Sequence, residues 1–246
     1  PLVIYGVHVG DLEIGEQTPE DHPVARAAHG VHQLGLAEAR IPEPLEIETY
    51  PFQRQPKLDR KKIMSLYDGL DYMEKNQNII LLGPTGCGKT GLATSFLLHA
   101  IDQGYRGHFT SFANLVAELY ASMADRSEDK VIRKYVAYDC LVIDEVGYIE
   151  VEPAQVGLFF TLMQKRHKNK STLLTSNLWF SQWDSFLKNK HLTAALIDRL
   201  TENSHVINMK NCKTLRGKLD DLLKGEEDPE PSDDADSDPS EDNPSE

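Results

Sequence analysis

A glycine-rich stretch, GPTGCGKT at residues 83–90, has the residue types and spacing needed to bind phosphate. It fits the pattern G-x-x-x-x-G-K-[ST], in which backbone amides wrap phosphate oxygens, Lys89 neutralises them and Thr90 binds magnesium. A plain strand-to-helix turn is the alternative, but an apolar run precedes the stretch and a helical pattern follows it. We therefore predict a nucleotide site with Mg²⁺. The predicted binding residues of this stretch are Gly83, Pro84, Thr85, Gly86, Cys87, Gly88, Lys89, Thr90 and Gly91.

A second group of candidate residues is the acidic pair at the end of the apolar run CLVIDE. Asp144 suits a magnesium site, together with Thr90, and Glu145 suits the polarisation of an attacking water in phosphoanhydride hydrolysis. A solvated turn is the alternative for such a pair. The spacing from the phosphate loop leaves room for one additional strand, which favours ATPases of the additional-strand type over small-molecule kinases and GTPases.

Two further residues are candidates for sensing or stabilising the γ-phosphate. Asn177 follows the apolar run STLLTS, where its amide could hydrogen-bond the attacking water, although asparagine at a strand end is also a common turn former. Arg199 lies in the helical pattern TAALIDRLTE and could reach a nucleotide held by a neighbouring subunit. An ion pair with Asp198 or Glu202 is the alternative for Arg199.

The surrounding pattern predicts the elements that position these residues. Short apolar runs predict buried strands at 78–82, 107–112, 139–143, 172–176 and 204–209. Helical periodicity follows the phosphate loop up to Gly104, and returns in FANLVAELYAS and EPAQVGLFFTLMQKRHK. Strands that alternate with helices predict an α/β fold with a parallel sheet flanked by helices on both faces.

Three regions of the chain differ in composition. Residues 1–45 are broken by Gly and Pro and predict at most one helix, residues 46–220 form the working domain, and residues 221–246 are an acidic tail that we expect to be disordered. The formal charge is −13, but eleven Asp and Glu follow Lys224, so the remainder carries only −2. The acidic balance therefore does not exclude a nucleic-acid partner.

Cysteine usage and hydropathy indicate the compartment. The three cysteines of the chain are far apart and lack metal-ligand spacing, which favours a reducing environment. No apolar run is long enough for a membrane span, so we expect a cytoplasmic protein with no membrane partner.

Two basic clusters bear on DNA binding. The first comprises Arg54, Lys57, Arg60, Lys61 and Lys62, and the second comprises Lys165, Arg166, Lys168 and Lys170. Either cluster could neutralise phosphates. A lysine-rich helix end is also favoured by the helix dipole and by solubility.

The order and wording of several segments resemble the IstB-like AAA+ ATPases, which are transposase helpers of insertion sequences and relatives of DnaC-type helicase loaders. The resemblance covers about residues 46–218. The segments are YPFQRQPKLDRKKI, NIILLGPTGCGKT, GYRGHFTSFANLV, the run from CLVIDEVGY to LLTSN, and ALIDRLTENSHVINMKNCKTLRG.

The resemblance implies an AAA+ P-loop fold with a minimal or absent C-terminal lid. It implies ATP hydrolysis, assembly as a homo-oligomer on double-stranded DNA, and stimulation of a partner transposase. Carried over, it assigns Walker A to 83–90, Walker B to Asp144 and Glu145, sensor one to Asn177, an arginine finger to Arg199 and a second sensor to Arg216. Two alternatives stay open, a helicase loader in replication and a nucleotide-gated DNA-binding switch with negligible turnover.

Overall fold

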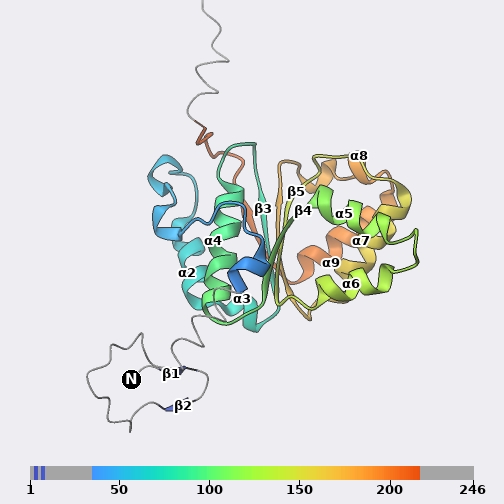
Figure 1. Ribbon diagram of the computed structural model, residues 1–246. Coiled ribbons are helices and arrows are strands. Elements are labelled where there is room, and N and C mark those ends of the chain that lie inside the picture. The colour runs from blue at the N-terminus through green and yellow to red at the C-terminus, as the bar shows by residue number, and fades with distance from the viewer. Residues whose placement is uncertain (1–2, 5–6, 9–34, 217–246) are drawn as a thin grey trace, which may run out of the picture. The chain divides into compact units, whose positions relative to one another are not determined.

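The computed structural model describes residues 3–4, 7–8 and 35–216 (Figure 1). The chain divides into two compact units, Pro1–Leu215 and Arg216–Glu246. At the start of the first unit, β1 (Val3–Ile4) pairs antiparallel with β2 (Val7–His8), and residues 35–39 are helical. The other residues before Gly35 in the predicted N-terminal segment 1–45 lie outside the described residues. The predicted acidic tail 221–246 also lies outside them.

The centre of the first unit is a five-stranded parallel sheet with the strand order β4-β5-β6-β3-β7. Its strands are β3 (Asn78–Leu82), β4 (Gly107–Ser111), β5 (Cys140–Val146), β6 (Ser171–Ser176) and β7 (Ser204–Asn208). The central strands β3, β5 and β6 are almost entirely buried, because both faces of the sheet are covered. The predicted parallel sheet and all five predicted strands are confirmed, within a few residues at each end.

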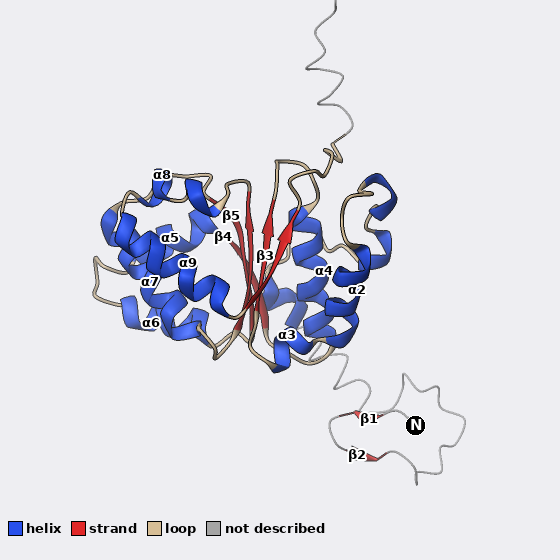
Figure 2. Ribbon diagram, turned by 180° about the vertical axis from the view of Figure 1, so that it is seen from behind, coloured by secondary structure: helices blue, strands red, loops and turns tan. Residues whose placement is uncertain are grey.

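Helices pack on the two faces of the sheet in separate groups, as Figures 1 and 2 show. On one face lie α2 (Arg60–Gly69), α3 (Asp71–Glu74) and α4 (Lys89–Asp102), with the short turns η2 (Ile47–Thr49) and η3 (Phe52–Arg54). On the other lie α5 (Phe112–Ala121), α6 (Glu128–Val136), α7 (Pro153–Arg166), α8 (Asp184–Leu187) and α9 (Lys190–Glu202), with η4 (Phe180–Gln182).

The core is divided in the same way, because alternate residues of a strand point to opposite faces. In β3, Ile79 and Leu81 belong to the apolar cluster under α4, whereas Ile80 and Leu82 belong to the cluster under α5 and α7. All four side chains are buried. Burial on both sides fixes the position of β3, and therefore of the glycine-rich loop that follows it.

The sheet order has one feature that bears on the site. Strand β6 lies between β3, which leads into the phosphate loop, and β5, which carries Asp144. The additional strand that the spacing predicts between the two motifs of the sequence is β4, which pairs with β5 at the edge of the sheet. No helix within residues 35–216 is both long and apolar enough to cross a membrane.

Candidate nucleotide-binding site

The glycine-rich loop joins β3 to α4 at the carboxyl edge of the sheet. Glycine is required at two of its positions, at one because of close packing and at the other because of the backbone conformation. A Cβ on Gly83 would lie 2.7 Å from Met209 Cβ and 3.0 Å from the Met209 carbonyl oxygen. Gly88, the N-cap of α4, has φ +92°, a left-handed conformation that glycine adopts without strain. The chain thus turns directly into the first residues of α4, whose unpaired backbone amides are suited to an anion.

Lys89 is buried inside this loop, with only 7% of its surface exposed. Its Nζ donates to the carbonyl oxygens of Gly83 and Pro84, each at 2.8 Å. The ammonium group is therefore held in the concave side of the loop, close to the position that a bound phosphate needs for charge neutralisation.

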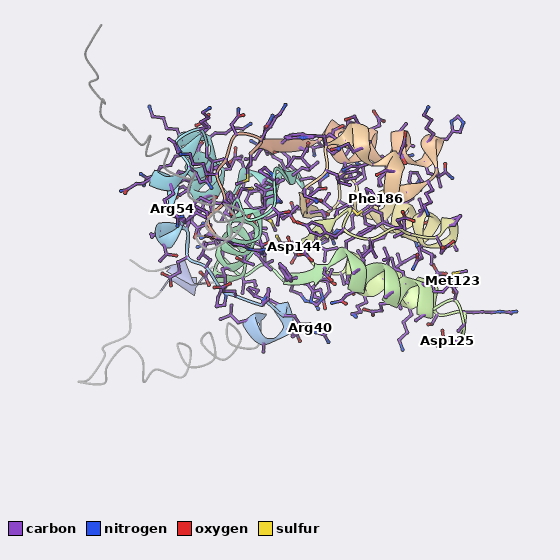
Figure 3. All side chains as sticks on the ribbon, turned by 90° about the horizontal axis from the view of Figure 1, so that it is seen from above. Arg40, Arg54, Met123, Asp125, Asp144 and Phe186 are labelled. Atoms are coloured by element: carbon purple, nitrogen blue, oxygen red, sulfur yellow. The ribbon has the colours of Figure 1, made fainter. Side chains whose placement is uncertain are left out.

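The acidic motif lies at the end of β5, and Figure 3 shows Asp144 in the middle of the molecule. The Thr90 hydroxyl donates to both carboxylate oxygens of Asp144, at 3.2 and 3.0 Å. Asp144 is buried, with 6% exposure. The structure thus brings together the two predicted magnesium ligands, which are 54 positions apart in the sequence.

The oxygen donors of this pair fit Mg²⁺. Magnesium prefers hard oxygen ligands and usually takes one or two from the protein and the rest from water and nucleotide phosphates. Within the described residues no group of three or more His, Cys, Asp or Glu could hold a metal by itself. One hydroxyl and one carboxylate beside a phosphate loop are therefore the arrangement expected for a metal shared with a nucleotide.

Glu145 is presented to solvent by a local irregularity of the sheet. The register between β5 and β6 shifts between Ile143 and Val146, and Glu145 has φ +62°, a strained conformation for a non-glycine residue. Its neighbours Asp144 and Val146 are buried, whereas Glu145 is exposed. Such bulges redirect side chains at functional sites, and this one points the carboxylate of Glu145 away from the core.

Thr175 supports both acidic residues, a role that the sequence did not reveal. Its hydroxyl donates to Asp144 Oδ1 and accepts from the backbone N–H of Glu145 at 3.0 Å. The side chain is 1% exposed. The signal available in the sequence was only its place at the end of an apolar run, two residues before the predicted sensor Asn177.

Asn177 follows β6 directly and has an unsatisfied polar atom. Its Oδ1 is buried and has no hydrogen-bond partner among the described residues. Because an orphaned buried amide oxygen is unfavourable, it indicates a missing ligand or water. Nearby, Tyr148 Oη lies 3.0 Å from Thr85 Oγ1, a contact that joins the segment after β5 to the phosphate loop.

Residues that precede β3 and follow β7 in the sequence form hydrogen bonds with the backbone of the phosphate loop. The Cys87 carbonyl accepts from Tyr50 Oη at 3.1 Å and from Gln55 Nε2 at 3.3 Å, and Leu215 N donates to the Gly86 oxygen at 2.8 Å. Burial raises the pKa of Tyr50 well above its ordinary value, so its phenol stays protonated and can donate. These contacts were also missed, since the partners lie far apart in sequence.

Arg199 lies on α9 and is partly buried. Its guanidinium donates to the Ala195 carbonyl oxygen at 3.1 Å and lies 4.8 Å from the centre of the Phe160 ring. The alternative of an ion pair with Asp198 or Glu202 has no support among the described residues, where Glu202 pairs instead with His167 and Lys168.

Arg199 and the phosphate loop are at opposite ends of the sheet. Its carbonyl oxygen is 3.0 Å from Nδ1 of His167, which precedes β6, whereas the loop follows the carboxyl end of β3. Arg199 therefore does not belong to the nucleotide site of its own subunit. Arg216 begins the second unit, so its assignment as a second sensor stays a prediction.

The fold and the site define the class. A parallel sheet with an additional strand between the phosphate loop and the acidic motif, and helices on both faces, is the AAA+ P-loop fold. Residues 20–219 match the family of IstB-like ATP-binding proteins, and this chain belongs to that family. The predicted resemblance is thereby confirmed.

Two relatives illustrate the similarity. A protein of Pseudomonas aeruginosa, named as an ATP-binding protein of insertion sequence IS21, is 34% identical over 186 residues, which cover 74% of this chain and 70% of the relative. A protein of Geobacillus stearothermophilus, named likewise for insertion sequence IS5376, is 33% identical over 187 residues, which cover 76% and 74%.

Solved structures share the fold at lower identity. The DnaC helicase loader aligns with a TM-score of 0.55 and 20% identity, covering 71% of this chain and 97% of that chain. AMPPCP-bound DnaA from Aquifex aeolicus aligns with a TM-score of 0.58 and 17% identity, covering 76% and 57%.

Proposed function

We propose that this chain is an ATPase that binds ATP and Mg²⁺, assembles on double-stranded DNA and acts as a helper of transposition. The observation that carries the catalytic part is the contact of Thr90 with Asp144 beside an exposed Glu145. A protein that bound the nucleotide without hydrolysing it would need Thr90 and Asp144 but not Glu145.

Each residue of the site has a distinct role in this proposal. Backbone amides at the start of α4 bind the β- and γ-phosphates. The Lys89 ammonium binds them too, and its hydrogen bonds to the loop carbonyls are replaced by hydrogen bonds to phosphate oxygens. Thr90 and Asp144 would hold Mg²⁺, which would neutralise charge on the phosphates when bound. Glu145 accepts a proton from the attacking water, and the free amide oxygen of Asn177 accepts a second hydrogen bond that orients this water.

Arg199 completes the site of a neighbouring subunit. Its guanidinium has no carboxylate partner among the described residues, and it lies at the end of the sheet opposite its own phosphate loop. An arginine supplied by a neighbour stabilises the charge that develops on the γ-phosphate, and it makes hydrolysis depend on assembly. We therefore propose a homo-oligomer with nucleotide at the interfaces.

The proposed partners are duplex DNA and a transposase. The names of the two relatives place them in insertion sequences, and this supports the same setting for this chain. The described cysteines are free and buried, as suits the reducing cytoplasm that we propose as its location.

The test is steady-state ATP hydrolysis with no DNA, with duplex and with single strands, with particle size recorded in parallel. We expect duplex to stimulate turnover and to enlarge the particle. Glu145→Gln is expected to abolish turnover while ATP binding persists. Unchanged turnover in Glu145→Gln would contradict the assigned chemistry, and stimulation by single strands alone would favour a helicase loader.

A further inference from the structure

One of the two basic clusters of the sequence is a free surface. Arg54, Lys57, Arg60, Lys61 and Lys62 are all exposed, and they follow one another from η3 into the first turn of α2. We call these five residues the cationic face. Figure 3 shows Arg54 at the periphery, away from Asp144 in the middle of the molecule.

The cationic face is not neutralised from within the part of the chain that the structure describes. None of its five residues takes part in the ion pairs found there. The nearby carboxylate of Asp59 is used to cap the helix, accepting from the backbone N–H of Lys62 at 3.0 Å. Arg54 donates to the Leu215 carbonyl at 3.4 Å, and Arg60 lies 5.3 Å from the centre of the Phe52 ring.

The second basic cluster has the opposite character. Lys165, Lys168 and Lys170 pair with Asp129, Glu202 and Asp139 at 3.5, 2.5 and 2.5 Å. Arg166 is 1% exposed and donates to the carbonyl oxygens of Tyr135, Tyr138 and Ser171 and to the Thr172 hydroxyl. The three lysines of this cluster are thus paired with carboxylates, and Arg166 is buried against α6 and the start of β6.

Helix stability does not explain the cationic face. Arg60, Lys61 and Lys62 are the first three residues of α2, and its first turn contains no acidic residue. Cations at a helix N-terminus oppose the helix dipole and repel one another, which is a cost to the stability of the helix. An external polyanion would reverse this cost.

We propose that the cationic face binds the phosphate backbone of duplex DNA; this rests on the proposed function and assigns DNA binding to these residues. The same segment also contacts the nucleotide site, because Gln55 donates to Cys87 in the phosphate loop and exchanges hydrogen bonds with Lys213. A residue that lies between Arg54 and Lys57 of the cationic face is therefore hydrogen-bonded to the phosphate loop.

The experiment compares two triple variants of the full chain that remove the same charge. Lys57→Gln/Lys61→Gln/Lys62→Gln changes the cationic face, and Lys165→Gln/Lys168→Gln/Lys170→Gln changes the paired cluster. Binding of a fluorescent duplex of about 30 base pairs is measured by anisotropy, with a non-hydrolysable ATP analogue and Mg²⁺, at several salt concentrations. Binding of the analogue alone is measured in parallel.

Each lost phosphate contact lowers the salt slope by about 0.9. The first variant lacks three such contacts. Between about 50 and about 200 mM salt, the affinity of the wild type for duplex should therefore fall about 40-fold more than the affinity of the first variant. The second variant should keep the wild-type slope, and both should bind the analogue normally.

Equal slopes for the wild type and the first variant would overturn the assignment of this surface while leaving DNA binding itself in place. Loss of analogue binding in the first variant would also overturn it, because these cations would then serve the nucleotide. A wild type that binds no duplex would overturn both this inference and the proposed DNA function.

Discussion

Removal of the Thr175 hydroxyl tests whether the acidic motif is held in place by β6. Thr175→Val keeps the shape and burial of the side chain but loses the hydrogen bond to Asp144 and leaves the Glu145 N–H without its partner. A hydrogen bond to a charged group contributes about 2 kcal/mol, and an unpaired buried N–H costs about 1 kcal/mol or more. The expected loss in the free energy of unfolding is therefore about 3 kcal/mol.

Thr175→Val should also lower ATP turnover by more than its loss of stability explains. Groups that orient metal ligands typically contribute about 10- to 100-fold in metal affinity or activity, and Thr175 is hydrogen-bonded to both the proposed metal ligand and the proposed base. We expect ATP turnover by Thr175→Val to fall by about that factor at a temperature where the variant is folded. Thr175→Ser, which restores the hydroxyl, should recover most of it.

Thr172→Val is the matched control. Thr172 lies on the same strand, is equally buried, and accepts a hydrogen bond from the charged Arg166 at 3.0 Å, at the end of β6 away from the site. Its loss should cost about 1.5–3 kcal/mol of stability and leave turnover unchanged. Denaturant unfolding and a coupled ATPase assay measure the two quantities, and full turnover by folded Thr175→Val would refute the positioning role.

Three further predictions concern the loop and its surroundings. Gly83→Ala should destabilise the fold by about 1–3 kcal/mol and weaken nucleotide binding, because its Cβ would meet Met209. Thermal unfolding and nucleotide titration measure the two effects, and wild-type values in both would contradict the prediction. Gln55→Leu should weaken ATP binding about tenfold through loss of the contact to Cys87, and an unchanged titration would exclude that role. Burial lowers the pKa of His108, so the unfolded chain binds its proton more readily and stability should fall as pH drops below about 6.5, by up to about 1.4 kcal/mol per pH unit. Unfolding curves of His108→Gln should show a weaker pH dependence, and an identical slope would contradict this.

The strands and the phosphate loop could be predicted because their signals are local. The run NIILL is apolar throughout, since β3 is buried on both faces, and the glycines that follow mark the turn into α4. Predicted and observed bounds agree for this strand. Helix α6 was not predicted, because its residues are mostly charged and only Ile132 and Tyr135 are buried.

The geometry of the acidic motif could not be predicted, because it depends on pairing between strands. The left-handed conformation of Glu145 arises where the register of β5 shifts against β6, and nothing in CLVIDE signals this shift. The contacts of Tyr50 and Gln55 with Cys87 likewise join residues 37 and 32 positions apart.

Basic residues gave an ambiguous signal for the same reason. The sequence shows two clusters of similar density, but the partners that neutralise the second one come from other elements. Asp129 lies in the first turn of α6, Asp139 precedes β5 and Glu202 ends α9, so the difference between the clusters emerges only when the chain is folded.

The most direct test of hydrolysis at subunit interfaces is ATP turnover by a mixture of two inactive variants on duplex DNA. Lys89→Ala removes the lysine that we propose binds phosphate, and Arg199→Ala removes the residue that we propose is supplied to the neighbour. We predict that each variant alone is nearly inactive, and that an equal mixture recovers about a quarter of wild-type turnover, because one interface in four combines an intact Lys89 with an intact Arg199. Turnover of the mixture no higher than that of the separate variants would contradict a shared active site.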